Sequence, residues 1–549
     1  MKNKKFLCLT CLGLMLTMLF TSCVVKESGT TPNTISPGTK EAESEKFEPL
    51  LKEKITLKML CQANQALSND MPVIQELERL TNVHLEFEIL PAVSAQRWER
   101  FAAAMAAREP FDLVMYQYKN DLAKYGMEGV FIPLNDLMKK HAPYLYQKLK
   151  DPLGDAVVPY TTNVLPEITA PDGNIYNIPL ISPANAVGAI WGIRKDWLDK
   201  LNLKMPETTD ELYEVLKAFK VNDPNGNGLP DEVPLGCTGG GTLVYNFLPL
   251  LNGFGAHITL YVDKADDTIK YGPIESVWKD GMMFLNKLYK EELMDPNWTT
   301  ATANTYNAQV SGNQLGLMYA WPGSGLGNAT KELQKIDPSY RFVPMPPLKA
   351  PNGDRFKDTS TAGQIVVPRT AITATNKYPV ETIKYLEFMF TEEGDRCIRY
   401  GIEGVHYDMV NGKPKIKQYL LDDKTGLGGK DGIDMAPLGF LSLWDRQAQY
   451  DANNPNYVKE EDPYYVYMQP GTVEAPMPSL IFMDSELEKG PDAFKAINSY
   501  AYSKWTPFIV GEEPLDKYDD YVAQIKTLGI DEVLRIYNKA YGRYRLSGK

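Results

Sequence analysis

Residues 55–89, ITLKMLCQANQALSNDMPVIQELERLTNVHLEFEI, contain the pattern from which the fold is predicted. Apolar and polar side chains alternate at 55–59 and again at 83–89, and this period of two predicts a strand at each end. Between the strands, apolar residues recur at helical spacing and predict a helix over 72–80. The stretch is therefore expected to form a β-α-β unit.

Outward from this unit, an alanine-rich helix is expected over 96–108 and a short apolar strand over 111–116. The β-α-β-α-β order predicts a mostly parallel, doubly wound sheet, in which ligands bind beyond the carboxyl ends of the strands. The residues just after two of these strands are therefore candidate ligand contacts: Asn64, Gln65, Tyr116 and Gln117.

The N-terminus has the three parts of an export signal over residues 1–22. Its apolar run, 6–20, is short for a membrane span, and Phe20-Thr21-Ser22-Cys23 resembles a bacterial lipobox, whose cysteine receives a lipid. A plain secretory signal or a short membrane anchor is the alternative. Residues 23–50, rich in small and polar residues after the lipidated Cys23, are expected to be a disordered tether.

Composition argues against two classes of function. The 549 residues include 70 acidic and 58 basic ones, a formal net charge of −12, which argues against a nucleic-acid binder. Four histidines, none spaced as a pair, leave no zinc-hydrolase motif. Beyond the signal and Cys23, three cysteines remain, which we expect to be small buried residues: Cys61, Cys237 and Cys397.

One motif is sharp. Residues 223–232, DPNGNGLPDE, match the first half of an EF-hand loop, with oxygen-bearing side chains at alternate positions and glycine at the sixth. Pro234 stands at the twelfth position, where a glutamate is usual, so Glu232 would supply the bidentate contact. The expected ligands of a structural calcium ion are Asp223, Asn225, Asn227, the carbonyl of Leu229, Asp231 and Glu232. An ordinary tight surface turn is the alternative.

The middle and end of the chain continue to mix strands and helices. Residues 189–198 are expected to be a strand that turns into a helix, with Trp197 in the core. Thr208 followed by Glu211 has the spacing of a capping box. We also expect a strand over 364–367, a helix over 379–390, and C-terminal helices that break at Gly529 and bury a stripe of tyrosines.

Together, several features resemble the family 1 extracellular solute-binding lipoproteins of bacterial ABC importers. They are the signal with Cys23, the tether, the calcium-like loop, WGIRKDWLDKL at 191–201, GIEGVHY at 401–407 and YNKAYGRY at 537–544. The chain is similar to the alginate-oligosaccharide-binding branch, whose members carry a calcium loop of this kind. The resemblance covers essentially the whole mature chain.

The resemblance implies a two-lobed α/β fold of the periplasmic-binding-protein type II, each lobe a mostly parallel sheet flanked by helices, with a hinge between the lobes. Lobe 1 is expected at 51–178 plus 357–430, and lobe 2 at 179–356 plus 431–549. It also implies a monomeric, lipid-anchored receptor on the extracytoplasmic face of the cell membrane. Such a receptor captures an oligosaccharide between its lobes and delivers it to ABC permease subunits, without being an enzyme.

A carbohydrate site needs aromatic platforms for the C–H faces of sugar rings and planar polar groups for their hydroxyls. Trp191, Trp321 and Trp444 are the expected platforms, and burial in a core is the alternative for each. Glu403 and, more weakly, His406 are suggested by the family-like segment around them, although a lone histidine is more often structural.

Two rival functions stay open. A secreted glycosidase or lyase is the main one, because a sequence does not reveal whether two carboxylates face each other across a cleft. A solute-binding protein for a peptide or another non-sugar ligand is the second. The tryptophans favour a sugar, and no nucleophile elbow of the G-x-S-x-G type occurs.

Overall fold

The computed structural model describes residues 48–62, 67–116, 118–151, 163–182, 189–238, 243–356, 365–421, 466–467 and 477–547. The export signal, Cys23 and most of the tether lie outside these ranges. Within them, no helix has both the length and the apolar character needed to cross a bilayer.

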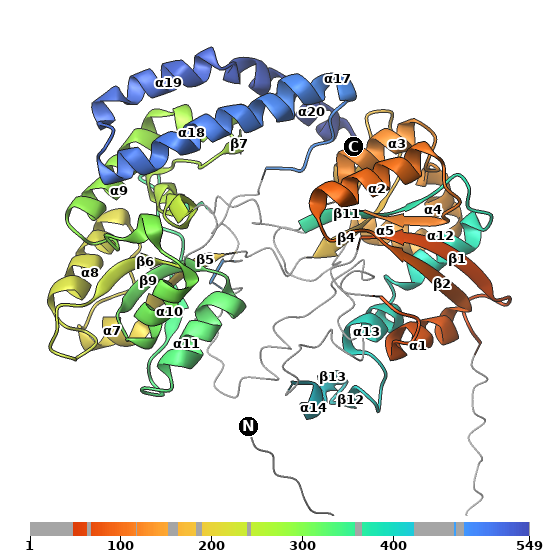
Figure 1. Ribbon diagram of the computed structural model, residues 1–549, viewed down its shortest axis with the longest axis horizontal. Coiled ribbons are helices and arrows are strands. Elements are labelled where there is room, and N and C mark those ends of the chain that lie inside the picture. Colours follow the sequence, from red (N-terminus) through yellow and green to blue (C-terminus); the bar gives the residue numbers. More distant parts are fainter. Residues whose placement is uncertain are drawn as a thin grey trace, which may run out of the picture. The chain divides into compact units, whose positions relative to one another are not determined.

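The first of two main sheets has five strands in the order β2-β1-β3-β11-β4 (Figure 1). The strands are β1 Ile55–Cys61, β2 Val83–Ile89, β3 Leu113–Met115, β4 Ile178–Ser182 and β11 Ile365–Ile372. β1 pairs in parallel with β2 and β3, and α1 (Pro72–Thr81) and α2 (Ser94–Ala106) connect them. The expected β-α-β-α-β start is confirmed.

Both faces of this sheet are covered. On β1, Leu57 and Met59 belong to one hydrophobic core and Leu60 to another, because neighbouring side chains of a strand point to opposite faces. The buried stripe of α1 lies in the first core and that of α2 in the second. The two helices therefore pack on opposite faces, as a doubly wound arrangement requires.

The second half of the first sheet contains one reversed strand and one segment that was expected elsewhere. β11 is antiparallel to both of its neighbours, β3 and β4, so four strands of this sheet run in one direction and β11 runs against them. Residues 179–182, which we expected in lobe 2, pair with β11 in the first sheet. Strand direction and sheet membership depend on pairing between distant segments, which local periodicity does not contain.

The second sheet has the order β10-β5-β9-β6. Its strands are β5 Ile190–Arg194, β6 Val233–Cys237, β9 Leu315–Ala320 and β10 Phe342–Pro344. Only β6 and β9 are parallel; β5 is antiparallel to both β9 and β10. β5 therefore runs against the other three strands, which share one direction. The expected turn from strand into helix is confirmed, since α7 (Lys195–Lys200) follows β5 directly.

The helix after this turn, α8 (Thr209–Val221), packs on β6 (Figure 1). The Thr208 hydroxyl accepts a hydrogen bond from the Glu211 N–H at 3.3 Å, so the predicted N-cap is confirmed. The carboxylate of Glu211 reaches back one residue further than a capping box requires, and accepts from the Glu207 N–H at 2.7 Å.

Three long helices end the chain: α18 (Ala493–Val510), α19 (Tyr518–Thr527) and α20 (Ile530–Ser547). α18 packs along α9 (Ser276–Lys290) (Figure 1). Gly529, at φ 98°, separates α19 from α20. The Tyr521 hydroxyl accepts from the indole N–H of the buried Trp505 at 3.0 Å. The core role expected for the tyrosine stripe is confirmed: Tyr518 and Tyr537 are buried, and Tyr541 and Tyr544 pack partly buried against the same core.

The remaining helices and strands are shorter. They are α3 Lys119–Met127, α4 Asn135–His141, α5 Pro143–Lys150, α6 Leu165–Ile168, α10 Ala303–Ser311, α11 Asn328–Leu333, α12 Pro379–Phe388, α13 Glu392–Tyr400, α14 Gln418–Leu421, α17 Asp484–Leu487, β7 Leu260–Asp263, β8 Thr268–Tyr271, β12 Tyr407–Val410 and β13 Lys413–Ile416. The expected strand near 364–367 and helix over 379–390 correspond to β11 and α12. Cys61, Cys237 and Cys397 are buried, as expected.

Candidate functional site

Four residues at the carboxyl end of the first sheet are expected to contact a ligand, and the structure describes one of them, Tyr116. Tyr116, directly after β3, is fully buried, and its hydroxyl has no hydrogen-bond partner among the described residues. Asn64, Gln65 and Gln117 lie outside the described residues. Their role stays a prediction.

The second sheet carries a pocket beside Trp191. The indole of Trp191, on β5, is 4% exposed and belongs to the core, but it also meets the Tyr319 ring of β9 at a centroid distance of 5.1 Å. A small pocket, with room for about one water molecule, adjoins both rings. It is lined by Trp191, Pro249, Asn252, Tyr319, Pro347, Leu348, Phe356 and Tyr467. The Tyr467 hydroxyl accepts a hydrogen bond from the backbone N–H of Trp191 at 3.2 Å and donates one to the Met345 carbonyl at 2.5 Å. These two bonds fix this side of the pocket.

The other predicted platforms differ in exposure. Trp321 follows β9 immediately and is 48% exposed. Its carbonyl accepts N–H bonds from Gly325 at 2.9 Å and Leu326 at 3.0 Å, which holds the glycine-rich loop in place. Trp444 lies outside the described residues. Trp197, by contrast, is 1% exposed, as expected for a core residue.

The two candidate ligand contacts in the family-like segment 401–407, Glu403 and His406, differ in burial. His406 is 1% exposed, and its Nδ1 accepts a hydrogen bond from the Ile402 N–H at 2.9 Å, so it has the structural role that a lone histidine usually has. Glu403 is exposed, in the turn between α13 and β12. A ligand could reach Glu403, which stays a candidate.

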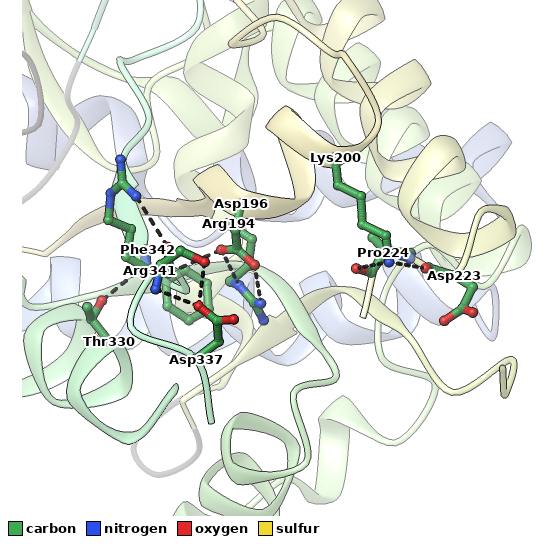
Figure 2. Close-up of polar contacts among 10 residues, drawn as sticks. Arg194, Asp196, Lys200, Asp223, Pro224, Thr330, Asp337, Arg341 and Phe342 are labelled. Atoms are coloured by element: carbon green, nitrogen blue, oxygen red, sulfur yellow. Dashed lines mark hydrogen bonds and ion pairs between the residues drawn. The ribbon is translucent and has the colours of Figure 1, made fainter. Parts of the chain in front are cut away.

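The calcium-like loop is built around Asp223, whose carboxylate organises the turn. Its oxygens accept backbone N–H bonds from Gly226 at 2.9 Å, Asn227 at 3.1 Å and Gly228 at 3.0 Å. Both glycines have positive φ, 77° and 76°, which side-chain-bearing residues adopt at a cost. Lys200 Nζ donates to the carbonyls of Asp223 at 3.1 Å and Pro224 at 3.0 Å from outside the turn (Figure 2).

The other two carboxylates of the loop differ in their partners. Asp231 accepts from the side-chain amides of Asn225 at 2.9 Å, Asn227 at 3.1 Å and Gln314 at 2.8 Å. Burial raises the pKa of Asp231, but these hydrogen bonds together outweigh burial and hold that pKa below its usual range. Glu232 has a buried Oε1 without a hydrogen-bond partner among the described residues. Burial raises the pKa of Glu232, and the nearby charge of Asp231 raises it further.

This donor set suits a hard cation. The loop offers three carboxylates, two side-chain amides and the carbonyl of Leu229, which are the oxygen ligands that calcium prefers. The partnerless oxygen of Glu232 is where an added positive charge would be most favourable. In the described part of the chain, no three His, Cys, Asp or Glu side chains converge closely enough to form a ready metal cage. The oxygen donors of these residues therefore fit a calcium ion in their chemistry. In this structure the side-chain amides of Asn225 and Asn227 donate to Asp231.

The run WGIRKDWL has a structural explanation. Arg194, at the end of β5, is fully buried and makes two hydrogen bonds to Asp196, at 2.9 and 2.5 Å (Figure 2). Its guanidinium lies 4.7 Å from the centroid of the Trp197 ring. Asp196 also accepts from the Arg341 N–H at 3.1 Å, just before β10. The ion pair thus holds β5, α7 and β10 together and does not form part of the ligand pocket.

Sequence reasoning missed Trp98, an indole on α2 that is 53% exposed. The signal that could have found it is its position: it lies one turn before the buried Phe101, near the start of a helix that follows the carboxyl end of β2. An exposed tryptophan at that edge of an α/β sheet is a candidate ligand contact.

Comparison with known proteins gives consistent results. Residues 65–396 match the family described as bacterial extracellular solute-binding protein. The chain is 26% identical to the fructooligosaccharide ABC transporter substrate-binding protein FusA of Streptococcus pneumoniae, over 90% of this chain and 91% of that protein. It is 25% identical to lipoprotein LipO of Bacillus subtilis, over 86% and 89% of the two chains.

Among solved structures, alginate-binding protein AlgQ2 without calcium ion is similar to this chain with a TM-score of 0.63 and 28% identity. The match covers 90% of this chain and 99% of that one. This likeness over nearly the whole of both chains confirms the two-lobed solute-binding fold.

Proposed function

Because the chain belongs to the bacterial extracellular solute-binding protein family, we propose that it captures an oligosaccharide outside the cell and delivers it to an ABC transporter. The relatives that match over most of their length support a sugar: FusA is named for fructooligosaccharides and AlgQ2 for alginate. In this proposal the protein binds its glycan without cleaving it.

The observation that carries the proposal is the exposure of Trp321. Nearly half of this indole is open to solvent, at the end of a central strand of the second sheet and in a loop held by its own backbone bonds. Such a fixed, exposed ring is what the C–H face of a sugar stacks on. Trp191, whose ring meets Tyr319 on the same sheet, would provide a further contact.

We place the protein on the outer face of the cell membrane, anchored by a lipid on Cys23. The sequence Phe20-Thr21-Ser22-Cys23 and the polar stretch that follows it support this, and so does the likeness to LipO, which is named a lipoprotein. The permease subunits of the transporter would be its protein partners. The lobes would divide as expected above, with 179–182 moved to lobe 1 because they pair in the first sheet.

We further propose that the loop 223–232 holds a structural calcium ion. The partnerless Glu232 oxygen and the likeness to AlgQ2, whose solved structure is described as lacking calcium ion, support this. The ion would be held by Asp223, Asn225, Asn227, the carbonyl of Leu229, Asp231 and Glu232. It would neutralise the acidic loop and stabilise the turn between α8 and β6.

A thermal-shift screen tests the proposed function. The mature chain from Cys23 onward, in detergent and calcium, is mixed separately with neutral oligosaccharides, uronate oligosaccharides and peptides. A ligand at 100 times its Kd adds about 2.7 kcal/mol to the free energy of unfolding, which gives a clear rise in Tm. We expect a rise with one class of glycan, recovered intact by chromatography. A cleaved glycan would indicate an enzyme, and a rise in Tm with peptides alone would refute the proposal that the ligand is a sugar.

A further inference from the structure

A row of aromatic rings runs from a core of the first sheet to the surface beyond β3. The rings of Phe101, on α2, and Tyr116 stack at a centroid distance of 3.8 Å and an angle of 6°. Tyr118 is tilted against Tyr116 at 5.0 Å. Trp98 lies three residues before Phe101 on α2, so the two are neighbours on one face of the helix. The middle of the row is buried, whereas Trp98 and Tyr118 are 53% and 45% exposed.

Two polar atoms beside this row lack partners. The hydroxyl of Tyr116 and Nε of Arg97 are both buried, and neither has a hydrogen-bond partner among the described residues. Nη1 of Arg97 donates to the Ala92 carbonyl at 3.0 Å, which holds the guanidinium in place. A buried donor without an acceptor costs free energy, so two of them at one place indicate a group that arrives later.

The position of the aromatic row in the fold also agrees with a bound ligand. Tyr116 and Tyr118 follow β3, and Arg97 and Trp98 lie in the first turns of α2, the helix that follows β2. β1, β2 and β3 are parallel, so these segments meet at the carboxyl edge of the parallel strands. Ligands of open α/β sheets bind at this edge.

We propose that Trp98 and Tyr118 form a subsite for one uncharged sugar ring, with the Tyr116 hydroxyl and Nε of Arg97 as donors to its hydroxyl oxygens. This rests on the proposed function, to which it adds a place and a class of sugar. The C–H face of the ring covers Trp98. Tyr118, which lies against Tyr116 at the surface, turns aside so that the ring reaches the buried hydroxyl.

The charges of the site favour an uncharged ring. Asp121, in the first turn of α3, acts on the Tyr116 hydroxyl more strongly than Arg97 does: burial and then the charge of Asp121 raise the pKa of Tyr116, and Arg97 lowers it. Burial also raises the pKa of Asp121 itself. A ring carboxylate at this hydroxyl would therefore face a half-buried acid. Arg97 acts on the hydroxyl more weakly than Asp121 does, and Lys124 offsets part of the charge of Asp121.

Calorimetry on the full mature chain tests the subsite, with kestose and maltotriose as neutral probes and trigalacturonate as the acidic one. For the neutral probe that binds, Trp98→Ala should weaken affinity on the order of tenfold and Trp98→Phe should restore most of it. Tyr116→Phe should weaken affinity about three- to tenfold without lowering Tm, since the hydroxyl has no partner to lose. Tyr144→Ala, which removes a ring that is 42% exposed on α5, is the matched control and should change nothing.

The outcomes separate this proposal from the proposed function. Neutral-probe affinities that stay unchanged in both Trp98→Ala and Tyr116→Phe would overturn the subsite and leave sugar capture intact. Binding of trigalacturonate alone would overturn the uncharged ring. No binding of any glycan to the wild type would overturn both proposals. Normal glycan affinity with lost uptake in cells carrying Trp98→Ala would reassign the surface to the permease.

Discussion

Replacing Glu232 by glutamine separates a calcium site from an ordinary turn, because the two interpretations predict opposite changes of stability. Without calcium, the wild-type loop keeps a buried carboxylate oxygen that has no partner and lies near the charge of Asp231. The amide of Glu232→Gln has nearly the same shape and no charge. The variant should therefore be more stable than the wild type in a chelator, by about 1 kcal/mol, the order of cost of one unsatisfied buried polar group.

With calcium, the order should reverse. At 100 times its Kd, calcium adds about 2.7 kcal/mol to the wild type. A hundredfold loss of affinity on removing one of three carboxylates leaves the variant a gain of only about 0.4 kcal/mol. For a cooperative unit of about 150–250 residues, each kcal/mol shifts Tm by roughly 2–4 °C. The wild type should therefore rise by roughly 5–10 °C on adding calcium, and Glu232→Gln by about 1 °C.

Scanning calorimetry at pH 7, in calcium and in chelator, measures all four values. Asp223→Asn is the matched control: its carboxylate accepts three backbone N–H bonds, so weakening them should lower Tm in both buffers. The gain of Glu232→Gln in chelator should also fade as pH falls through the raised pKa of Glu232 and be lost below about pH 4.5, since a raised pKa penalises only the ionised form. Equal Tm changes for Glu232→Gln in both buffers would refute calcium binding by this loop.

Three further outcomes follow from individual side chains. Trp321→Ala should weaken glycan binding in calorimetry with Tm unchanged, because the indole is half exposed; a large fall in Tm would instead make it a packing residue. Arg194→Ala should lower the free energy of unfolding in urea by about 3–5 kcal/mol, since it leaves the largely buried carboxylate of Asp196 unpaired; a loss under 1 kcal/mol would contradict the anchoring role. Burial opposes ionisation of Glu486, but Arg543 and other donors hold the pKa of Glu486 down to about 2, so the advantage of wild type over Glu486→Gln should be full above pH 4.5 and lost as pH falls toward 2. An advantage that does not change between pH 6 and pH 3 would argue against this ion pair.

Parts of the site were predictable for a local reason. The hydrogen bonds of the 223–232 loop run between residues within six positions of one another, with Gln314 and Lys200 as the outside partners. Its spacing in the sequence was therefore enough to single it out.

The exposure of the other tryptophans was not predictable. Trp98 and Trp197 both lie in short charged segments near the start of a helix, yet one is 53% exposed and the other 1%. The difference arises from partners far along the chain: Trp197 meets Phe219 edge to face at 5.1 Å. No such ring contact covers Trp98 among the described residues. A local pattern gives the side chain and its helix, but not what packs against it.

The local elements of this protein follow from neighbouring residues alone: the β-α-β-α-β start, the capped helix at Thr208, the break at Gly529 and the acidic loop. Each depends on contacts within a few residues, so periodicity and spacing contain it. Three other features appear only once the chain has folded: β11 returns antiparallel between β3 and β4, 179–182 join the first sheet, and Trp321 and Trp98 face solvent. These features depend on which distant segments meet, and that choice is made by the free energy of the whole core.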